Sequence, residues 1–236
     1  DVPQAKLAKA SWQLEPAGKR QLLERVTSSG TPLRKYLGSR VSRGITTGLN
    51  EAFVIDGEAR ARLIAEDAKS SDIIKPFMRG NDVKRWRPNF DDKYLIKIES
   101  SDNVPHPWSE KKDAEAEEVF AKCYPAIHAH FETYRQAMIN RYDQGKYFWE
   151  LRACTYWQDF EQPKIVSTKV SIEPTFSLDN KAHYLGNTAY FIPAGDDRLY
   201  LLAMLNSSVS AYYARGHFVG KQNGYYEVQP DALEAF

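Results

Sequence analysis

The hydrophobic positions of this 236-residue chain alternate between a helical and a strand spacing. Apolar residues three and four apart predict helices, because such residues share one helical face. Pro125 divides the longest of these stretches and is suited to the first turn of a helix. The predicted helical segments are 12–26, 58–67, a long zone at 110–142, and 199–213.

Strand spacing is clearest at 94–99, where Tyr94, Ile96 and Ile98 would share one face of a sheet. Further strands are predicted at 53–55, 149–154, 164–168, 188–192 and 224–228. The strands and helices do not alternate as regular βαβ units. The pattern therefore predicts an α+β fold, with an irregular mixed or antiparallel sheet and packed helices.

The first helix is followed by the turn-forming residues 28–32, which hold two serines, a glycine and a proline. We therefore expect residues 1–38 to be a helical connector from an upstream domain and residues 39–236 to be the main domain. The chain begins without methionine and ends soon after a turn-like Gln-Pro-Asp, so we expect both ends to be cuts in a longer polypeptide.

Composition narrows the class of protein. Hydrophobic residues make up 42% of the chain, which is typical of a globular protein. The longest apolar run, 199–205, is far shorter than the roughly 20 residues that span a bilayer. No signal-peptide pattern opens the chain, and Cys123 and Cys154 form no CxxC motif. We expect a cytoplasmic protein without a membrane partner, a disulfide or a zinc site.

The net charge of +1 hides a segregation of charge along the chain. Segment 34–43 has four basic residues and no acid, and segment 75–87 has five basic residues and one acid, whereas segment 110–118 is acidic. One interpretation is a face with a positive field, and the other is solvated loops and a solvated helix.

Catalytic motifs are missing from the sequence. It contains no glycine-rich dinucleotide or phosphate loop, no GxSxG, and no Asn/Asp-Pro-Pro-Tyr/Phe tetrapeptide. His128 and His130 are two residues apart on a predicted helix, so their side chains point about 200° apart and cannot share a metal. Asp102, Glu110 and Lys112 match a nuclease site only loosely. We expect no catalytic residue, no metal and no cofactor here.

Six stretches in a fixed order resemble one family. They are GITTGLNEAFVID at 44–56, IIKPFMRGNDVKRW at 73–86, YPAI at 124–127, YFWELR at 147–152, PKIV at 163–166 and LNSS at 205–208. Over about 10–236 the chain resembles the TaqI-like C-terminal specificity domain. This domain is the target-recognition module of large adenine-N6 DNA methyltransferases, including fused type II restriction–modification enzymes and phage-defence methylases.

The resemblance implies a module that recognises a double-stranded DNA sequence and is not itself an enzyme. An upstream methyltransferase domain would hold S-adenosylmethionine and the flipped adenine, and Mg²⁺ would be needed where the parent protein also cleaves DNA. The alternative is a protein-interaction module that docks a nuclease or specificity subunit of a restriction–modification complex. That alternative predicts an exposed apolar patch and no basic face.

Segment 73–86 and its neighbours supply the candidate phosphate contacts. Such contacts fix the register of a protein on DNA and carry no sequence information. The apolar residues Ile73, Ile74, Phe77, Val83 and Trp86 would anchor the segment in the core, and Asp82 would hold a backbone N–H or an arginine. A purely structural role for the segment stays open. The candidate phosphate-binding residues are Arg40, Arg43, Lys75, Arg79, Lys84, Arg85 and Arg87.

Base readers are expected in loops outside the shared stretches, because arginine or lysine suits guanine and asparagine or glutamine suits adenine. The polar loop 216–224 is the first such loop, and the loop after the strand at 164–168 is the second. Arg152 lies in an aromatic stretch and could instead pair with Glu150 or Asp159. The aromatic rings at 147–160 could stack on an unpaired base or be buried in a core. The candidate base-reading residues are Arg152, Lys169, His217, Lys221, Gln222 and Asn223.

Overall fold

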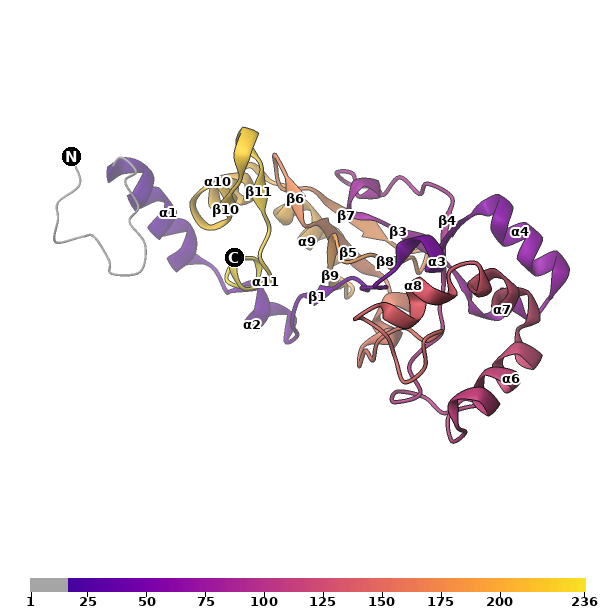
Figure 1. Ribbon diagram of the computed structural model, residues 1–236. Coiled ribbons are helices and arrows are strands. Elements are labelled where there is room, and N and C mark those ends of the chain that lie inside the picture. The colour runs from indigo at the N-terminus through magenta and orange to yellow at the C-terminus, as the bar shows by residue number, and fades with distance from the viewer. Residues whose placement is uncertain (1–16) are drawn as a thin grey trace.

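Three small β-sheets form the middle of the molecule, and helices pack around them (Figure 1). The computed structural model describes residues 17–236. The central sheet has the order β1 (Ser42–Arg43), β9 (Ala189–Pro193), β5 (Lys164–Thr168) and β7 (Phe176–Asp179), and all neighbours are antiparallel. The predicted α+β class is confirmed.

The two other sheets flank the central one. The second has the order β2 (Val54–Asp56), β4 (Lys93–Ile96), β3 (Ile74–Met78) and β8 (Tyr184–Leu185). Its β3–β8 pair is parallel, while its other pairs are antiparallel. The third has the order β10 (Val219–Gly220), β11 (Tyr226–Glu227) and β6 (Val170–Ser171).

The central sheet separates two hydrophobic cores. Along β5, Val166 enters the larger core and its neighbour Ile165 enters the smaller one. Along β9, Phe191 and Ile192 divide in the same way. Because successive side chains of a strand point to opposite faces, a strand between two cores is buried along its whole length. This is why all five residues of β5 are buried, and the strands predicted at 164–168 and 188–192 are confirmed.

Helices occupy both ends of the molecule, with α1 at one end and α4 and α6 at the other (Figure 1). Within residues 17–236 no helix combines the length and the apolar character needed to cross a membrane. The α-helices are α1 (Ala17–Ser29), α2 (Leu33–Leu37), α3 (Asn50–Phe53), α4 (Gly57–Glu66), α5 (Ser70–Ile73), α6 (Asp113–Cys123), α7 (Pro125–Glu132), α8 (Arg135–Asn140), α9 (Arg198–Leu205), α10 (Ser208–His217) and α11 (Pro230–Glu234). The 3₁₀ turns used below are η2 (Gly80–Asp82), η3 (Trp157–Glu161) and η4 (Gln222–Gly224).

The predicted helical zone at 110–142 is three helices, α6, α7 and α8. Pro125 begins α7, as predicted. Ile127, Phe131 and Met138 are buried in the larger core, so the predicted apolar stripe is confirmed across the break between α7 and α8. Helix α4 confirms the helix predicted at 58–67, and the Asp56 carboxylate caps it by accepting a hydrogen bond from Ala59 N at 2.9 Å.

The strand predicted at 149–154 is wrong, because this segment is an irregular turn organised by Glu150. The Glu150 carboxylate is fully buried and accepts hydrogen bonds from Trp108 Nε1 at 2.9 Å, Tyr147 N at 3.3 Å and both the N–H and the hydroxyl of Ser101. A buried carboxylate needs such donors to replace its water. The local sequence offers an alternating aromatic pattern, but the donors from Ser101 and Trp108 come from loops more than forty residues away.

Arg141 is a second buried charge in this region, and it serves as a backbone clamp. Its guanidinium donates to the carbonyls of Thr47, Asp143, Phe148 and Glu150. The group lies above the Phe53 ring, and burial lowers its pKa to about 10. Five N–H donors in a planar fork suit a site that collects several carbonyls. Arg141 therefore ties the turn before α3 to the loop after α8.

The helix predicted at 199–213 is also wrong, because it divides into α9 and α10. The break lies at Asn206, whose side chain bonds to the Phe176 backbone. Its Oδ1 accepts from Phe176 N at 3.1 Å, and its Nδ2 donates to the Phe176 carbonyl at 2.9 Å. The Ser207 hydroxyl then caps α10 by accepting from Ser210 N. Serine and asparagine side chains favour helix caps over helix interiors, because they hydrogen-bond to nearby backbone groups.

Other predicted boundaries shift by a few residues. Phe53 ends α3, and the strand predicted at 53–55 is β2, one residue later. The strand predicted at 224–228 shortens to β11. The helix predicted at 12–26 is α1, which extends to Ser29, and Trp12 lies outside the described residues. Tyr94 is only partly buried, while both Leu95 and Ile96 are fully buried, so β4 is covered on two faces.

Candidate nucleic-acid interface

A cleft of about 970 Å³ lies between α4, α7 and the ends of β3 and β8, and it is called the cleft below. Segments 79–81 and 186–188 meet there because β3 and β8 are parallel and end at the same edge of their sheet. Gly80 N donates to Thr188 Oγ1 at 2.8 Å. A Cβ at Gly80 would lie only 2.4 Å from the Thr188 carbonyl oxygen, so the close approach requires glycine.

Two asparagines from these segments line the cleft. Asn81 is exposed in η2, and Asn187 is half-buried in the turn between β8 and β9. Neither side chain has a hydrogen-bond partner among residues 17–236. An asparagine side chain can bind adenine N6 and N7 through two hydrogen bonds. The sequence prediction missed both residues, because their proximity depends on a parallel pairing of strands about a hundred residues apart in the chain.

Four cationic side chains line the cleft, and so do the three acids Glu51, Asp56 and Glu66. Arg62 and Lys93 form no ion pair with any other residue that the structure describes. Arg79 and Lys169 already form ion pairs with carboxylates. The four cations outnumber the three acids by one, and when the two paired cations are left out the cleft has no excess of positive charge. The four cations are Arg62, Arg79, Lys93 and Lys169.

Segment 73–86 combines a structural and an exposed part. The Asp82 carboxylate accepts from Arg79 N at 2.7 Å and lies 3.5 Å from Arg79 Nε, which confirms the expectation for Asp82. Arg79 Nη2 also pairs with Asp91 at 2.6 Å. Ile74, Phe77 and Val83 are buried and Ile73 packs against the same core, as predicted. The prediction that Trp86 anchors the segment is wrong, because 45% of this residue is exposed.

The predicted base-reading loop at 216–224 includes β10 and the tip of the β10–β11 hairpin, and β11 of this hairpin pairs with β6. Glu227 binds Lys221 Nζ at 2.6 Å and Lys169 Nζ at 3.3 Å, and these bonds, with Lys221 first, lower the pKa of the Glu227 carboxyl. Gln222 and Asn223 are exposed at the tip. Lys169 lies between the hairpin and the cleft, so it joins the two regions into one candidate interface.

His217 lies at the end of α10, beside the hairpin. Its ring stacks on the Tyr213 ring with centroids 3.9 Å apart, and its Nδ1 lies 3.1 Å from the Tyr213 carbonyl oxygen. One ring face is therefore covered, and the remaining imidazole nitrogen is available for a partner.

Other predicted contacts lie outside the cleft. Arg40 lines a shallow hollow between α2 and α11, and Arg85 lines another at the start of α10. Arg152 pairs with Asp143 at 3.0 Å and not with Glu150 or Asp159. The remaining four lie on β1, on β3 and in the exposed loop after η2, and only two of the thirteen candidates, Arg79 and Lys169, line the cleft. These four are Arg43, Lys75, Lys84 and Arg87.

The aromatic stretch at 147–160 is part of the larger core. Trp149 stacks on Phe120 at 5.1 Å and on Tyr147 at 4.8 Å. Trp157 and Phe160 are buried as well. Burial in the core, and not stacking on a base, therefore explains why aromatic residues occupy these positions.

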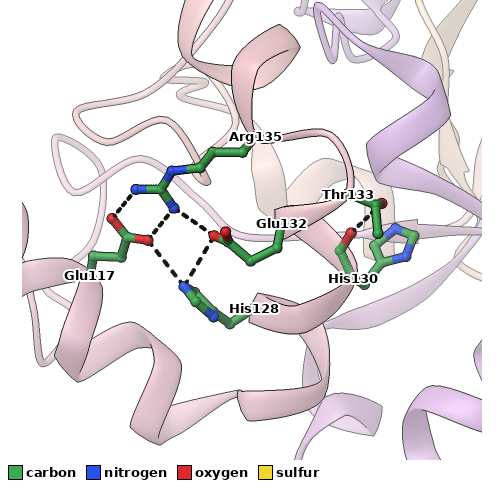
Figure 2. Close-up of polar contacts among 6 residues, drawn as sticks. All are labelled: Glu117, His128, His130, Glu132, Thr133 and Arg135. Carbon is green, nitrogen blue, oxygen red and sulfur yellow. Dashed lines mark hydrogen bonds and ion pairs between the residues drawn. The ribbon is translucent and has the colours of Figure 1, made fainter.

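One cluster could in principle hold a metal ion: Glu117, His128 and Glu132, whose ligand atoms all lie within 4.8 Å of one another (Figure 2). Arg135 already bridges the two carboxylates, at 2.7 and 2.5 Å from Glu117 and 2.5 Å from Glu132. The hydrogen bond from Arg135 is the main cause that lowers the pKa of Glu117. The guanidinium thus neutralises the charge that would attract a cation, and the cluster joins α6, α7 and α8.

His130 takes no part in this cluster (Figure 2). Its Nε2 lies 2.9 Å from the Ala52 carbonyl oxygen, and burial lowers its pKa. The two histidines diverge, as their spacing predicts.

Zinc addition tests the role of Arg135. We expect micromolar Zn²⁺ to leave the melting temperature of the wild-type chain unchanged, because the guanidinium occupies the cluster. In Arg135→Ala the three ligands are freed, and zinc is expected to stabilise the fold by about 2.7 kcal/mol at a hundred times Kd. Differential scanning calorimetry with and without EDTA measures both. Zinc stabilisation of the wild-type chain to the same extent would show that Arg135 does not block the site.

Comparison with known proteins agrees with the resemblance noted from the motifs. The family model described as "TaqI-like C-terminal specificity domain" matches residues 75–236. No curated protein matches the chain. Among solved structures, one match is to a protein reported as "Structure of Type IIL restriction-modification enzyme MmeI in complex with DNA has implications for engineering of new specificities". The TM-score is 0.53 at 11% identity, and the match covers 85% of this chain and 24% of that chain.

At this identity the structural match shows a shared fold only. The family model covers more than half of the chain, including the cleft segments that follow β3 and β8. On this basis, the chain belongs to the TaqI-like C-terminal specificity domain family.

Proposed function

We propose that this chain recognises a sequence in double-stranded DNA for a restriction–modification or phage-defence adenine-N6 DNA methyltransferase. The methyl transfer, with S-adenosylmethionine, would belong to another domain of the parent protein. In this module, lysines and arginines bind phosphates while amide and cationic side chains bind base edges.

The observation that carries this proposal is the composition of the cleft. It combines four cations with two asparagines that have no partner among residues 17–236, and it continues through Lys169 to the tip of the hairpin. Candidate phosphate-binding and base-reading groups thus lie side by side around the cleft. The family and the MmeI fold, seen bound to DNA, support the same assignment.

A docking role has one observation in its favour. A hollow of about 480 Å³ lies between the end of α1, α9 and α10, and Tyr36, Tyr200 and Met204 line it while remaining exposed. The protein-interaction alternative predicts such an apolar surface. This hollow is separate from the cleft, so a companion domain and DNA could bind at the same time.

The salt dependence of DNA binding tests the proposal. If the four cleft cations each neutralise one phosphate, log K falls with log salt concentration at a slope of about −3.6. Fluorescence anisotropy with a labelled random-sequence duplex measures this slope for the wild-type chain. A slope near zero would contradict DNA binding at the cleft.

Sequence specificity needs a second measurement. Repeated selection from a pool of randomised duplexes is expected to enrich one motif, because base-edge contacts each discriminate by about 1–3 kcal/mol. An Asn81→Ala, Asn187→Ala variant is expected to enrich a relaxed motif with the salt slope unchanged. An enriched pool that stays random would contradict the recognition role while leaving non-specific binding in place.

A further inference from the structure

Trp86 has a backbone conformation that its side chain disfavours. Its φ is 79°, in the left-handed region. A bulky residue is a genuine outlier there, since its Cβ crowds the backbone. Such strain persists only where the surrounding structure imposes it, and it is concentrated at functional positions.

Strand β7 imposes this conformation. Trp86 N donates to the Phe176 carbonyl at 2.8 Å, and Leu178 N donates to the Trp86 carbonyl at 3.2 Å. The Ser177 hydroxyl donates to the carbonyl of Lys84, two residues before Trp86. Both backbone groups of Trp86 are therefore paired with the sheet edge.

The strain does not serve to bury the indole ring. Trp86 is 45% exposed, whereas the other three tryptophans of the described chain are at most 5% exposed. The Arg85 guanidinium lies above the ring, 5.3 Å from its centroid, and is itself held by a hydrogen bond to the Asn206 carbonyl. A strained backbone thus holds a large apolar ring nearly half exposed to water, with the Arg85 guanidinium as its one ring contact among residues 17–236.

The surroundings of the ring indicate the chemistry of its partner. Lys84, Arg85 and Arg87 are exposed beside it, and Arg215 lines the same hollow as Arg85, with Glu173 as the one acid lining it. Lys84 and Arg87 form no ion pair with another described residue. Cations attract a polyanion, and an exposed aromatic ring suits a flat apolar surface. A nucleic acid combines both properties.

We propose that Trp86 is a DNA-contacting residue, whose ring packs against the bases of a duplex while Lys84, Arg85 and Arg87 bind the adjacent phosphates. This inference rests on the proposed function and adds a specific contact outside the cleft. Apolar side chains inserted at a base step deform the duplex locally, so the contact would favour sequences that are easily unstacked.

The Trp86→Gly variant separates a functional from a structural role. Glycine accepts the positive φ without strain, so the melting temperature is expected to rise by about 2–4 °C. Affinity for the duplex is expected to fall about 5- to 150-fold, the range found for loss of base–aromatic stacking. Trp86→Phe keeps a ring and is expected to retain most of the affinity.

A direct readout is acrylamide quenching of the tryptophan fluorescence that Trp86→Phe removes. In wild type this exposed component is expected to become protected when duplex DNA is added. Tyr142→Ala is the matched control, because that ring is 97% exposed and lies on another loop. The control is expected to leave affinity unchanged.

The failures are distinguishable. Wild-type affinity in Trp86→Gly, with unprotected fluorescence, overturns the assignment of Trp86 and leaves the proposed function intact. A lower melting temperature together with lost binding shows a structural role and overturns the inference. Absence of any salt-dependent duplex binding by the wild-type chain overturns both.

Discussion

Affinity for duplex DNA is expected to fall by about three orders of magnitude at roughly 0.1 M salt when all four cleft cations are replaced, provided that Arg79 and Lys169 leave their carboxylate partners for phosphates. Each phosphate that a protein neutralises contributes a slope of about 0.9 to the salt dependence, so four contacts account for about 3.6 logarithmic units between 1 M and 0.1 M salt. Fluorescence anisotropy over a range of salt concentrations measures the affinity and the slope together. The variant replaces four residues by glutamine: Arg62, Arg79, Lys93 and Lys169.

A matched control removes the same charge elsewhere. Four exposed cations that do not line the cleft are replaced by glutamine, namely Arg25, Lys112, Lys122 and Lys181. This control is expected to change the slope little, because phosphate contacts are local. An equal loss of affinity in both variants would mean that net charge, and not the cleft, determines binding.

Asp179→Asn is expected to lower the free energy of unfolding by about 3–5 kcal/mol, because it leaves the Lys164 ammonium buried without its counter-charge. Lys164 and Asp179 are 0% and 1% exposed, and Nζ lies 2.7 Å from Oδ2. The Lys164 ammonium also donates to the Phe160 carbonyl at 2.6 Å. The carboxylate further accepts from His183 Nδ1 at 2.8 Å and from two backbone N–H groups.

The pH dependence of this variant follows from the pKa of Asp179. Burial alone would raise that pKa, but the hydrogen bond from His183 and the charge of Lys164 outweigh burial and lower it to about 2. A carboxyl whose folded pKa lies below its unfolded value stabilises the fold above the unfolded pKa, and the contribution is lost as pH falls. The difference between wild type and Asp179→Asn is therefore expected to shrink from about pH 4 toward about pH 2.

Urea unfolding followed by circular dichroism measures both effects. Burial lowers the pKa of Lys164, since its ammonium has lost its water. A double variant, Lys164→Met with Asp179→Leu, removes both charges and is expected to be more stable than either single variant. Equal stability of the Asp179→Asn variant and wild type at neutral pH would show that the Lys164–Asp179 pair does not stabilise the fold.

The local spacing of apolar residues correctly predicted several elements that bury one face or both faces in a core. Helix α4, the stripe of α7, and strands β5 and β9 all follow from the spacing of their own apolar residues. The strand predicted at 149–154 failed because its aromatic spacing reflects ring stacking on Phe120 and a carboxylate buried under donors from residues 101 and 108. None of these three partners is near the segment in sequence.

The candidate interface was predicted in part. The sequence identified basic segments but not the acids that fold against them, such as Asp143 beside Arg152 and Asp91 beside Arg79. It also did not indicate Asn81 and Asn187, which meet because β3 and β8 run parallel. Spacing along the chain contains no information on such pairings.

The sequence by itself determined the family, the α+β class and most of the regular elements, because ordered motifs and periodic spacing are properties of neighbouring residues. The tertiary structure alone decided which charges are buried and which rings face water. Lys164 lies inside with its partner Asp179, and Trp86 is held partly exposed by hydrogen bonds to β7, a strand about ninety residues later in the chain. Burial and pairing depend on three-dimensional neighbours, and these exist only after the strands have paired.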